Sequence, residues 1–236
     1  MPKFKTELHC HTSEVSRCAG ENAADTVEKY IKYGYSTVVL TNHLSRGTFN
    51  TDELRDAPWE TKAAHFINGY NIMKEAAGDR LNILFGAEIN FPENNNDYLV
   101  FGLTPEILLE HPDMHLMNLE TFYNEVNHPH WMITIHAHPM RWRCQIMYPW
   151  FVDGWEIYNG HPRNQSHNEV TKAYAAYYPN KIVTSGSDHH DPEDFPDGGI
   201  ETDFEIKTME ELMATFRSKE YTIIEEEEIR EGTKRL

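Results

Sequence analysis

Histidine and acidic side chains that could bind metal ions gather at a few places in the sequence. The stretch TSGSDHHDPED contains Asp188, His189 and His190 directly after an apolar segment. Two further stretches carry the spacing H-x-H, which places both imidazoles on one face if the segment is a strand. These pairs are His9 with His11 and His136 with His138. Crowded imidazoles and carboxylates cost free energy unless something binds among them, so the pattern predicts a metal site.

The segments that position these residues alternate between strands and helices along the chain. Seven main strands are expected at 4–9, 36–43, 81–89, 97–103, 131–138, 154–159 and 181–187, with a last short strand at 221–227. Helices are expected at 23–34, 59–78, 119–128, 168–178 and 208–218. Such alternation favours an α/β fold with parallel strands and right-handed crossovers, and it is compatible with closure into a barrel. No repeat or linker interrupts it, so we expect one domain over residues 1–236.

Barrels of this kind carry their chemistry at the C-terminal ends of the strands. Five expected strand ends carry such side chains: His9 and His11; His43; Glu88; His136 and His138; and Asp188, His189 and His190. Strict alternation would place residues 188 and 190 on the same face and turn His189 away. His161 and His167 follow the sixth strand and could line the cleft, whereas the remaining histidines are expected to be structural.

The quoted motifs, taken in order, resemble those of a known family. ELHCHTSE, LTNHLS, FGAEI, IHAHP and SGSDHHDPED, which span about residues 5–205, are similar to the motifs of the PHP (polymerase and histidinol phosphatase) family of metal-dependent phosphoesterases. The closing stretch GGIETDFEIKTMEELMATFRSKEYTI is similar to the tail of many single-domain members. The resemblance implies a distorted seven-stranded (β/α)7 TIM-like barrel and a site for two or three divalent metal ions.

The resemblance also implies roles for individual residues. The implied metal ligands are His9, His11, His43, Glu88, His138, Asp188 and His190. Glu88 would be a bridging carboxylate, and Asp188 a second bridge. His189 occupies a variable position, and His136 is an additional histidine that would support the ligands or carry a proton.

Three positions depart from the family pattern. Asn42 stands where the family usually has an aspartate before the histidine of its second motif. After the first H-x-H, Glu14 or Cys18 would have to replace an acidic or histidine residue, or nothing does. Where many members have a histidine in the fourth strand, this chain has Asp97. These departures leave open whether a third metal binds.

The ligand types favour Zn, Mn or Fe over Mg, which prefers oxygen. Together with the resemblance, they predict a phosphoesterase that hydrolyses a nucleotide or a small phosphorylated metabolite through metal-activated water. Arg141, three residues after His138, could bind the substrate phosphate as a bidentate fork. Further candidates for this role are Arg143, Arg17 and Arg163. The candidate catalytic residues are Glu88, Asp188, Arg141 and His136.

Two other functions remain possible at the level of sequence. Hydrolases of the amidohydrolase type also open with H-x-H on the first strand, but they often use a carbamylated lysine and a lone late aspartate. Here Glu88 ends the third strand, and the late acid is followed by histidine in the pattern D-x-H. A non-catalytic metal-binding module is the other alternative, supported only by Asn42 and by the stretch after His11.

Composition limits the partners and the compartment. The formal net charge of -17 lacks the basic character of a nucleic-acid-binding protein, so nucleic acid is expected only as a substrate. No apolar run reaches the roughly 20 residues of a membrane span, and the N-terminal stretch shows no secretion signal. Three scattered cysteines do not form a disulfide framework, so a cytoplasmic location is expected. The expected partner is a small phosphorylated substrate, and the oligomeric state stays open.

Overall fold

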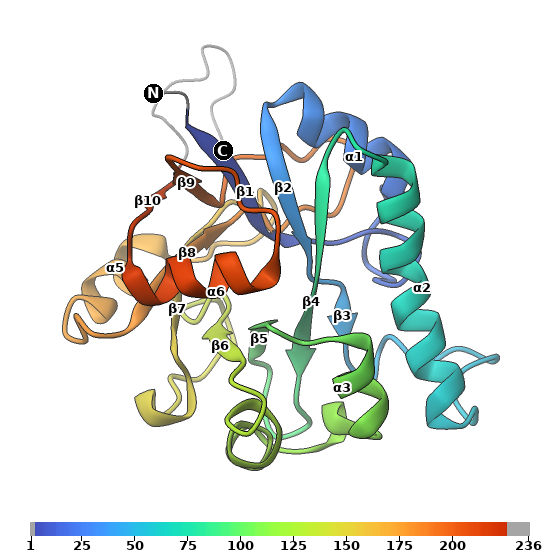
Figure 1. The fold of residues 1–236 in the computed structure, drawn as a ribbon. Coiled ribbons are helices and arrows are strands. Elements are labelled where there is room, and N and C mark those ends of the chain that lie inside the picture. Colours follow the sequence, from blue (N-terminus) through green and yellow to red (C-terminus); the bar gives the residue numbers. More distant parts are fainter. Residues whose placement is uncertain (1–2, 226–236) are drawn as a thin grey trace.

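The computed structural model describes residues 3–225, whose ten strands form one mixed sheet that curls into a nearly closed barrel (Figure 1). The strands are β1 (Phe4–Cys10), β2 (Tyr35–Leu40), β3 (His43–Leu44), β4 (Asn82–Asn90), β5 (Asp97–Phe101), β6 (Ile133–His136), β7 (Gly154–Asn159), β8 (Ile182–Gly186), β9 (Ile200–Thr202) and β10 (Thr222–Ile223). Their order in the sheet is β10-β9-β1-β2-β4-β5-β6-β7-β8, and β3 pairs with β4.

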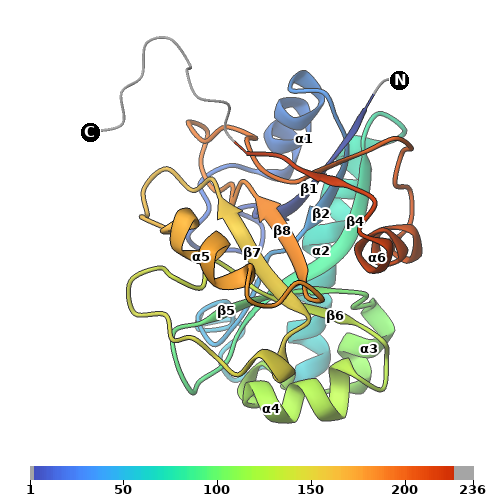
Figure 2. The same ribbon diagram turned by 90° about the vertical axis from the view of Figure 1, so that its left-hand side faces the viewer.

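Helices pack around this sheet (Figure 2). They are α1 (Ala23–Lys32), α2 (Trp59–Ala77), α3 (Pro105–Glu110), α4 (Leu119–Phe122), α5 (Asn168–Ala175) and α6 (Met209–Ser218), with 3₁₀ turns η1 (Met114–Leu116) and η3 (Pro149–Phe151) and a π-helical turn η2 (Tyr123–Asn127). α1 and α2 pack on each other and on β2 and β4, while α5 covers β7. Across residues 3–225, none of the helices has the length and apolar character needed to cross a membrane.

Apolar side chains from several strands fill one end of the barrel interior. Leu8, Val39, Leu99 and Ile135 belong to one buried cluster that also includes Phe216 of α6. α6 therefore closes this end of the barrel with its apolar face. A capping box holds the N-terminus of α6: the Thr208 hydroxyl accepts the backbone N–H of Glu211, and the Glu211 carboxylate accepts the backbone N–H of Thr208. The polar groups of the barrel are left to gather at the opposite end.

The seven predicted main strands are all present, but the predicted seven-stranded sheet is not confirmed, because β3, β9 and β10 add to it. The expectation of uniformly parallel pairing is also wrong, since β5 runs antiparallel to both β4 and β6. The link from Asn90 to Asp97 is too short for a crossover helix, so these strands can pair only as a hairpin. α3 was not predicted, and the expected last strand at 221–227 is seen as Thr222–Ile223, with residues from 226 on outside the described part.

The barrel closes where β1 meets the segment that follows β8. The backbone N–H of Asp188 donates to the carbonyl of His9 at 2.9 Å, and the N–H of His11 donates to the carbonyl of His189 at 3.0 Å. A side chain at Gly186 would lie 2.3 Å from Cβ of His9, so only glycine allows this close approach. Closure of the sheet therefore brings the first and last clusters of potential ligands together.

Glu7 reinforces the same seam from a fully buried position. Its Oε1 accepts backbone N–H groups from Leu8 and His9, each at 2.9 Å, and from Ser187 at 3.0 Å. Its Oε2 accepts the hydroxyl of Tyr30 at 3.0 Å and the hydroxyl of Ser187. One carboxylate thus joins β1, the segment after β8 and helix α1.

Replacement of Glu7 by alanine should therefore destabilise the fold strongly. Several buried donors would lose their acceptor, and unsatisfied buried groups cost about 1–3 kcal/mol each. We expect Glu7→Ala to lower the free energy of unfolding by about 3 kcal/mol or more in urea titrations. Glu28→Ala is the matched control, because Glu28 forms an exposed ion pair with Arg80 that is worth less than about 1 kcal/mol. Equal effects of the two changes would contradict this account of closure.

Candidate metal centre

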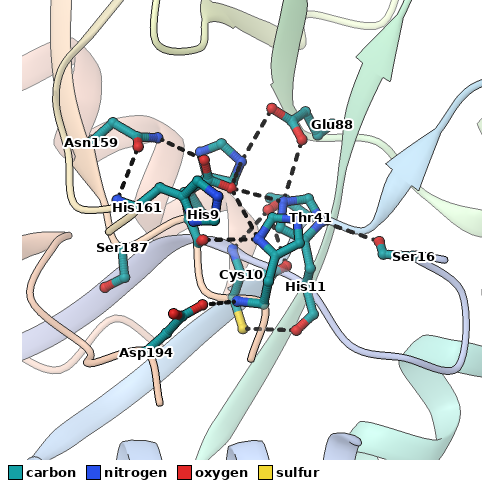
Figure 3. Close-up of polar contacts among 12 residues, drawn as sticks. His9, Cys10, His11, Ser16, Thr41, Glu88, Asn159, His161, Ser187 and Asp194 are labelled. Carbon is teal, nitrogen blue, oxygen red and sulfur yellow. Dashed lines mark hydrogen bonds and ion pairs between the residues drawn. The ribbon is translucent and has the colours of Figure 1, made fainter. Parts of the chain in front are cut away.

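The seven predicted ligands meet at the polar end of the barrel. They come from β1 and the residue after it (His9, His11), from β3 (His43), from β4 (Glu88), and from the segments after β6 (His138) and β8 (Asp188, His190). Figure 3 shows His9, His11 and Glu88 pointing toward one another. The sequence placed His43 at the end of the second strand, but β2 ends at Leu40. His43 begins the separate strand β3, where it is the register partner of Glu88.

Glu88 lies in the middle of the imidazoles and is fully buried. Its Oε1 is 3.2 Å from Nε2 of His9 and 3.1 Å from Nε2 of His138. Its Oε2 is 3.3 Å from Nε2 of His11 and 2.9 Å from Nδ1 of His43. Each carboxylate oxygen therefore faces two imidazole nitrogens, which is the arrangement that a bridging carboxylate needs.

Asp188 faces the same imidazoles with only one of its oxygens. Its Oδ1 lies 3.3 Å from Nε2 of His9, 3.4 Å from Nε2 of His11 and 3.4 Å from Nδ1 of His190. Its Oδ2 is turned the other way and accepts hydrogen bonds from Arg141 at 2.8 Å and from Asn159 at 3.2 Å. Asp188 has φ of +52°, and His138 has φ of +29°. Backbone in this sparsely populated region is common at functional sites, where packing enforces it.

The hydrogen bonds behind His9 and His11 leave their Nε2 atoms free for a metal ion. Nδ1 of His9 is 2.8 Å from Oε1 of Glu156, and a carboxylate can only accept there. Nδ1 of His11 is 3.1 Å from the Ser16 hydroxyl, whose single proton goes to Oδ1 of Asn42 at 2.8 Å. His11 must therefore donate from Nδ1. Both Nε2 atoms are buried and have no hydrogen-bond partner, a costly state that a bound cation would relieve.

This donor set fits Zn, Mn or Fe, because imidazole nitrogens and carboxylates are the ligands that these ions accept. Several groups of three residues each offer ligand atoms that lie within 4.8 Å of one another. These groups are His11, His43 and His190; His9, His11 and Glu88; and His9, His138 and Asp188. Overlapping groups of this kind could hold more than one ion.

Glu156 is a supporting residue that the sequence reading missed. Besides holding His9, its Oε2 accepts the backbone N–H of His138 at 2.9 Å and the side-chain amide of Asn159 at 2.9 Å. It therefore joins three parts of the centre. The available signal was a glutamate inside the otherwise apolar strand GWEIYN, since an acidic side chain in a buried strand needs specific partners.

Asn42, one of the departures from the family pattern, has a clear structural task. Its Oδ1 accepts the backbone N–H of Thr12 at 2.9 Å as well as the Ser16 hydroxyl, and Ser16 in turn accepts the backbone N–H of His43 at 3.0 Å. The neutral amide therefore preserves the hydrogen bonds that hold His11 and His43 in place, without adding a charge.

Of the three residues considered for a third metal, the structure brings two to the centre. Burial raises the pKa of the Cys18 thiol, but hydrogen bonds with His190 and His43 outweigh burial and lower it to about 6. Asp97 Oδ2 is 3.8 Å from Nε2 of His138, and burial together with the charge of Glu88 raises its pKa to about 6. Glu14 instead accepts the backbone N–H of Ala23 at the start of α1 and lies outside the cluster.

The remaining histidines separate as follows. His189 lies apart from the cluster, and its Nε2 contacts Glu21. His136 packs on the ring of Tyr98, belongs to none of the ligand groups, and has its pKa lowered to about 3 by burial and by His138. The structure therefore does not bring His136 into the centre. His161 lines the cavity described next, whereas His167 precedes α5 and does not.

A cavity of about 370 Å³ opens over the centre. Its lining consists of Cys18, His43, Glu88, Asp97, His138, Arg141, His161, Arg163, Asn164, Asp188, His190 and Asp191. Arg141 and Arg163 are the two arginines on its wall. Arg141 uses Nη2 to hold Asp188, Asn159 and Ser166. Neither Arg17 nor Arg143 lines it, and Arg17 donates instead to carbonyls of the loop at 47–50.

Protonated imidazoles balance the buried carboxylates when no metal is bound. Burial lowers the pKa of His9, but Asp188, Glu88 and Glu156 overcome this and raise it well above its ordinary value. Burial likewise opposes protonation of His138, yet contacts with Cys144 and Glu88 raise its pKa to about 9. The pKa values of His43 and His190 are also raised. Among these five imidazoles, His11 alone has a lowered pKa, of about 3, because of burial and of its two imidazole neighbours His190 and His43.

Known structures share this fold at low sequence identity. PsfC from Pseudomonas syringae superposes with a TM-score of 0.62 at 13% identity, covering 96% of this chain and 93% of PsfC. An amidohydrolase from Chromobacterium violaceum, solved with bound sulfate and no metal, superposes with a TM-score of 0.51 at 13% identity. The match covers 93% of this chain and 98% of the amidohydrolase. A protein of Bifidobacterium adolescentis, described as a proposed metal-dependent phosphoesterase, superposes with a TM-score of 0.50 at 16% identity. The match covers 83% of this chain and 93% of that protein. No protein-family model and no curated protein matches the chain.

Metal binding should release protons and should strengthen as pH rises. At pH 7 the raised pKa values keep His9, His43 and His138 protonated in the metal-free protein. A divalent ion must displace these protons, and the competition fades as pH rises through about 9, the pKa of His138. Calorimetric titration with Zn²⁺ or Mn²⁺ at pH 7, in two buffers of different ionisation enthalpy, should therefore give different heats. Identical heats, or affinity that falls between pH 7 and 9, would contradict this.

Proposed function

We propose that this protein is a metal-dependent phosphoesterase of the PHP kind that acts on a small phosphorylated substrate. The observation that carries the proposal is the centre itself. Two buried carboxylates, Glu88 and Asp188, each face at least three imidazole nitrogens, and hydrogen bonds to Glu156 and Ser16 direct unpaired Nε2 atoms into the space between them. Such a centre suits two or three divalent ions, with Zn, Mn or Fe as the ions its ligands favour.

Divalent ions bound there would lower the pKa of water and stabilise the charge that develops on the phosphoryl oxygens. The chain's own residues would prepare the site for this chemistry. Glu88 would contribute ligand oxygens to two groups of imidazoles, since each of its oxygens faces different rings. Asp188 would add a further ligand oxygen, kept in orientation by Arg141 and Asn159 on the far side of its carboxylate.

Substrate recognition falls to the cavity wall. A cavity of about 370 Å³ matches a small-molecule site and is too small for a folded macromolecule. Arg141 and Arg163 place positive charge on this wall, although both also hold carboxylates of the protein. Arginine binds phosphate oxygens strongly because its planar fork offers several donors. We propose that Arg141 supports Asp188 with Nη2 and meets the substrate phosphate with the rest of its guanidinium.

Amide hydrolysis is the second candidate, because one of the similar structures is an amidohydrolase. We rank it below phosphoester hydrolysis, since no lysine lines the cavity among residues 3–225, whereas amidohydrolases often use a carbamylated lysine. The two arginines on the wall are better suited to an anionic ester than to a neutral amide. A non-catalytic module would bind metals but turn over neither class of substrate.

The reaction class can be tested with purified, Mn²⁺-loaded or Zn²⁺-loaded protein. We expect turnover of phosphate monoesters, diesters or nucleotides and none of amides or lactams tested in parallel. Asp188→Ala and His190→Ala should lose nearly all of this turnover and at least one metal ion per chain. His189→Ala is the matched control, since its side chain contacts Glu21 outside the cluster, and it should retain most activity. Hydrolysis of amides alone, or equal loss in all three variants, would overturn the assignment.

Arg141 should affect catalysis without holding the metals. Loss of a charge-assisted hydrogen bond to the substrate phosphate costs about 1.5–3 kcal/mol, which corresponds to a roughly ten- to hundredfold fall in kcat/KM for Arg141→Ala. Metal content should stay unchanged, because Asn159 still donates to Asp188. Arg80→Ala is the control, since Arg80 pairs with Glu28 away from the cavity. An unaltered kcat/KM would remove Arg141 from substrate binding, and loss of metal would show a purely structural role.

A further inference from the structure

A second group of metal-binding side chains lies between α3 and the turn before β6. Glu110 is the last residue of α3, His111 follows it, and His130 lies in the turn that precedes β6. Nε2 of His111 and Nε2 of His130 are only 3.0 Å apart, and their rings stand nearly perpendicular at 83°. One ligand atom from each of the three residues lies within 4.8 Å of the other two.

This group is separate from the candidate metal centre. His130 precedes β6 (Ile133–His136), whereas His138 follows it, so the two clusters lie at opposite ends of the strand. A four-residue strand separates its ends by roughly 10 Å. None of the three residues lines the cavity over the centre. Any ligand held here would therefore act independently of the proposed reaction.

Two imidazole nitrogens that face each other at 3.0 Å need something between them, either a shared proton or a cation. Zinc binds imidazole at about 2.0–2.1 Å in tetrahedral geometry, which places two such ligand atoms about 3.3 Å apart, close to the observed spacing. Two histidines with one carboxylate form an established zinc-binding set.

We propose that Glu110, His111 and His130 form a peripheral Zn²⁺ site that ties the end of α3 to the turn before β6. All three side chains are exposed or only partly buried, so water completes the coordination and the ion exchanges freely with solvent. The site stabilises the segment between β5 and β6, because zinc that binds only the folded chain adds its binding free energy to folding. It takes no part in hydrolysis.

Equilibrium dialysis of the metal-free protein against Zn²⁺ tests the site. The wild-type chain should bind one more zinc ion than His111→Ala or His130→Gln, and all three should hydrolyse the preferred substrate equally well. Glu110→Gln should weaken this last binding step by at least about tenfold, since even indirect partners of a ligand contribute that much. His128→Ala is the matched control. It removes an imidazole from the same turn, where His128 stacks on Trp131, and it should bind as many ions as the wild type.

The alternative is a hydrogen bond between two neutral imidazoles, and His130→Gln separates the two cases. Glutamine can still exchange a hydrogen bond with His111, but it is a poor zinc ligand. If the wild type and His130→Gln bind equal numbers of zinc ions, the proposal is overturned. Should His111→Ala fail to fold, the comparison of the wild type, His130→Gln and Glu110→Gln still decides. A zinc-dependent rise in the thermal midpoint that is larger in the wild type than in His130→Gln supports the site.

Discussion

The burial of two carboxylates, Glu88 and Asp188, is the constraint on which the polar end of this barrel depends. A charge removed from water costs several kcal/mol unless opposite charge and hydrogen bonds compensate it. The structure surrounds this pair with imidazoles and places Arg141 behind Asp188. The carboxylates raise the pKa values of most of these imidazoles, so without metal the protons on the rings supply the positive charge. Divalent ions would supply the same charge at the same place, so the site is organised for cations in either state.

The geometry of the centre and the closure of the barrel rest on the same contacts. The backbone of Asp188 pairs with that of His9 across the seam between β1 and the segment after β8, so any opening of the seam would also separate these two side chains. Glu7 holds both sides of this seam, through backbone donors of His9 and Ser187, while Glu156 holds His9 and the backbone of His138. Buried acidic residues outside the candidate ligand set therefore help to hold the centre together.

The reversed direction of β5 adds to the centre in a way that a regular barrel could not. In a parallel strand, Asp97 at the strand's start would lie at the end filled by apolar residues and α6. Because β5 is antiparallel, Asp97 lies at the polar end, 3.8 Å from His138. The similar structures share this fold but are described as a phosphoesterase and an amidohydrolase, so the fold alone does not fix the reaction.

The sequence by itself indicated the seven main strands, most of the helices and the seven candidate ligands, because these depend on local patterns: apolar periodicity, and histidine or acidic residues where a strand ends. It could not decide what depends on contacts between distant segments. The antiparallel β5, the three additional strands and the supporting roles of Glu7 and Glu156 follow from pairing and burial that no local pattern encodes. Which of Glu14, Cys18 and Asp97 lies near the candidate metal centre also depends on the tertiary structure. Glu14 caps α1, whereas the other two reach the cluster only once the loop after His11 and the β4–β5 hairpin have packed against it.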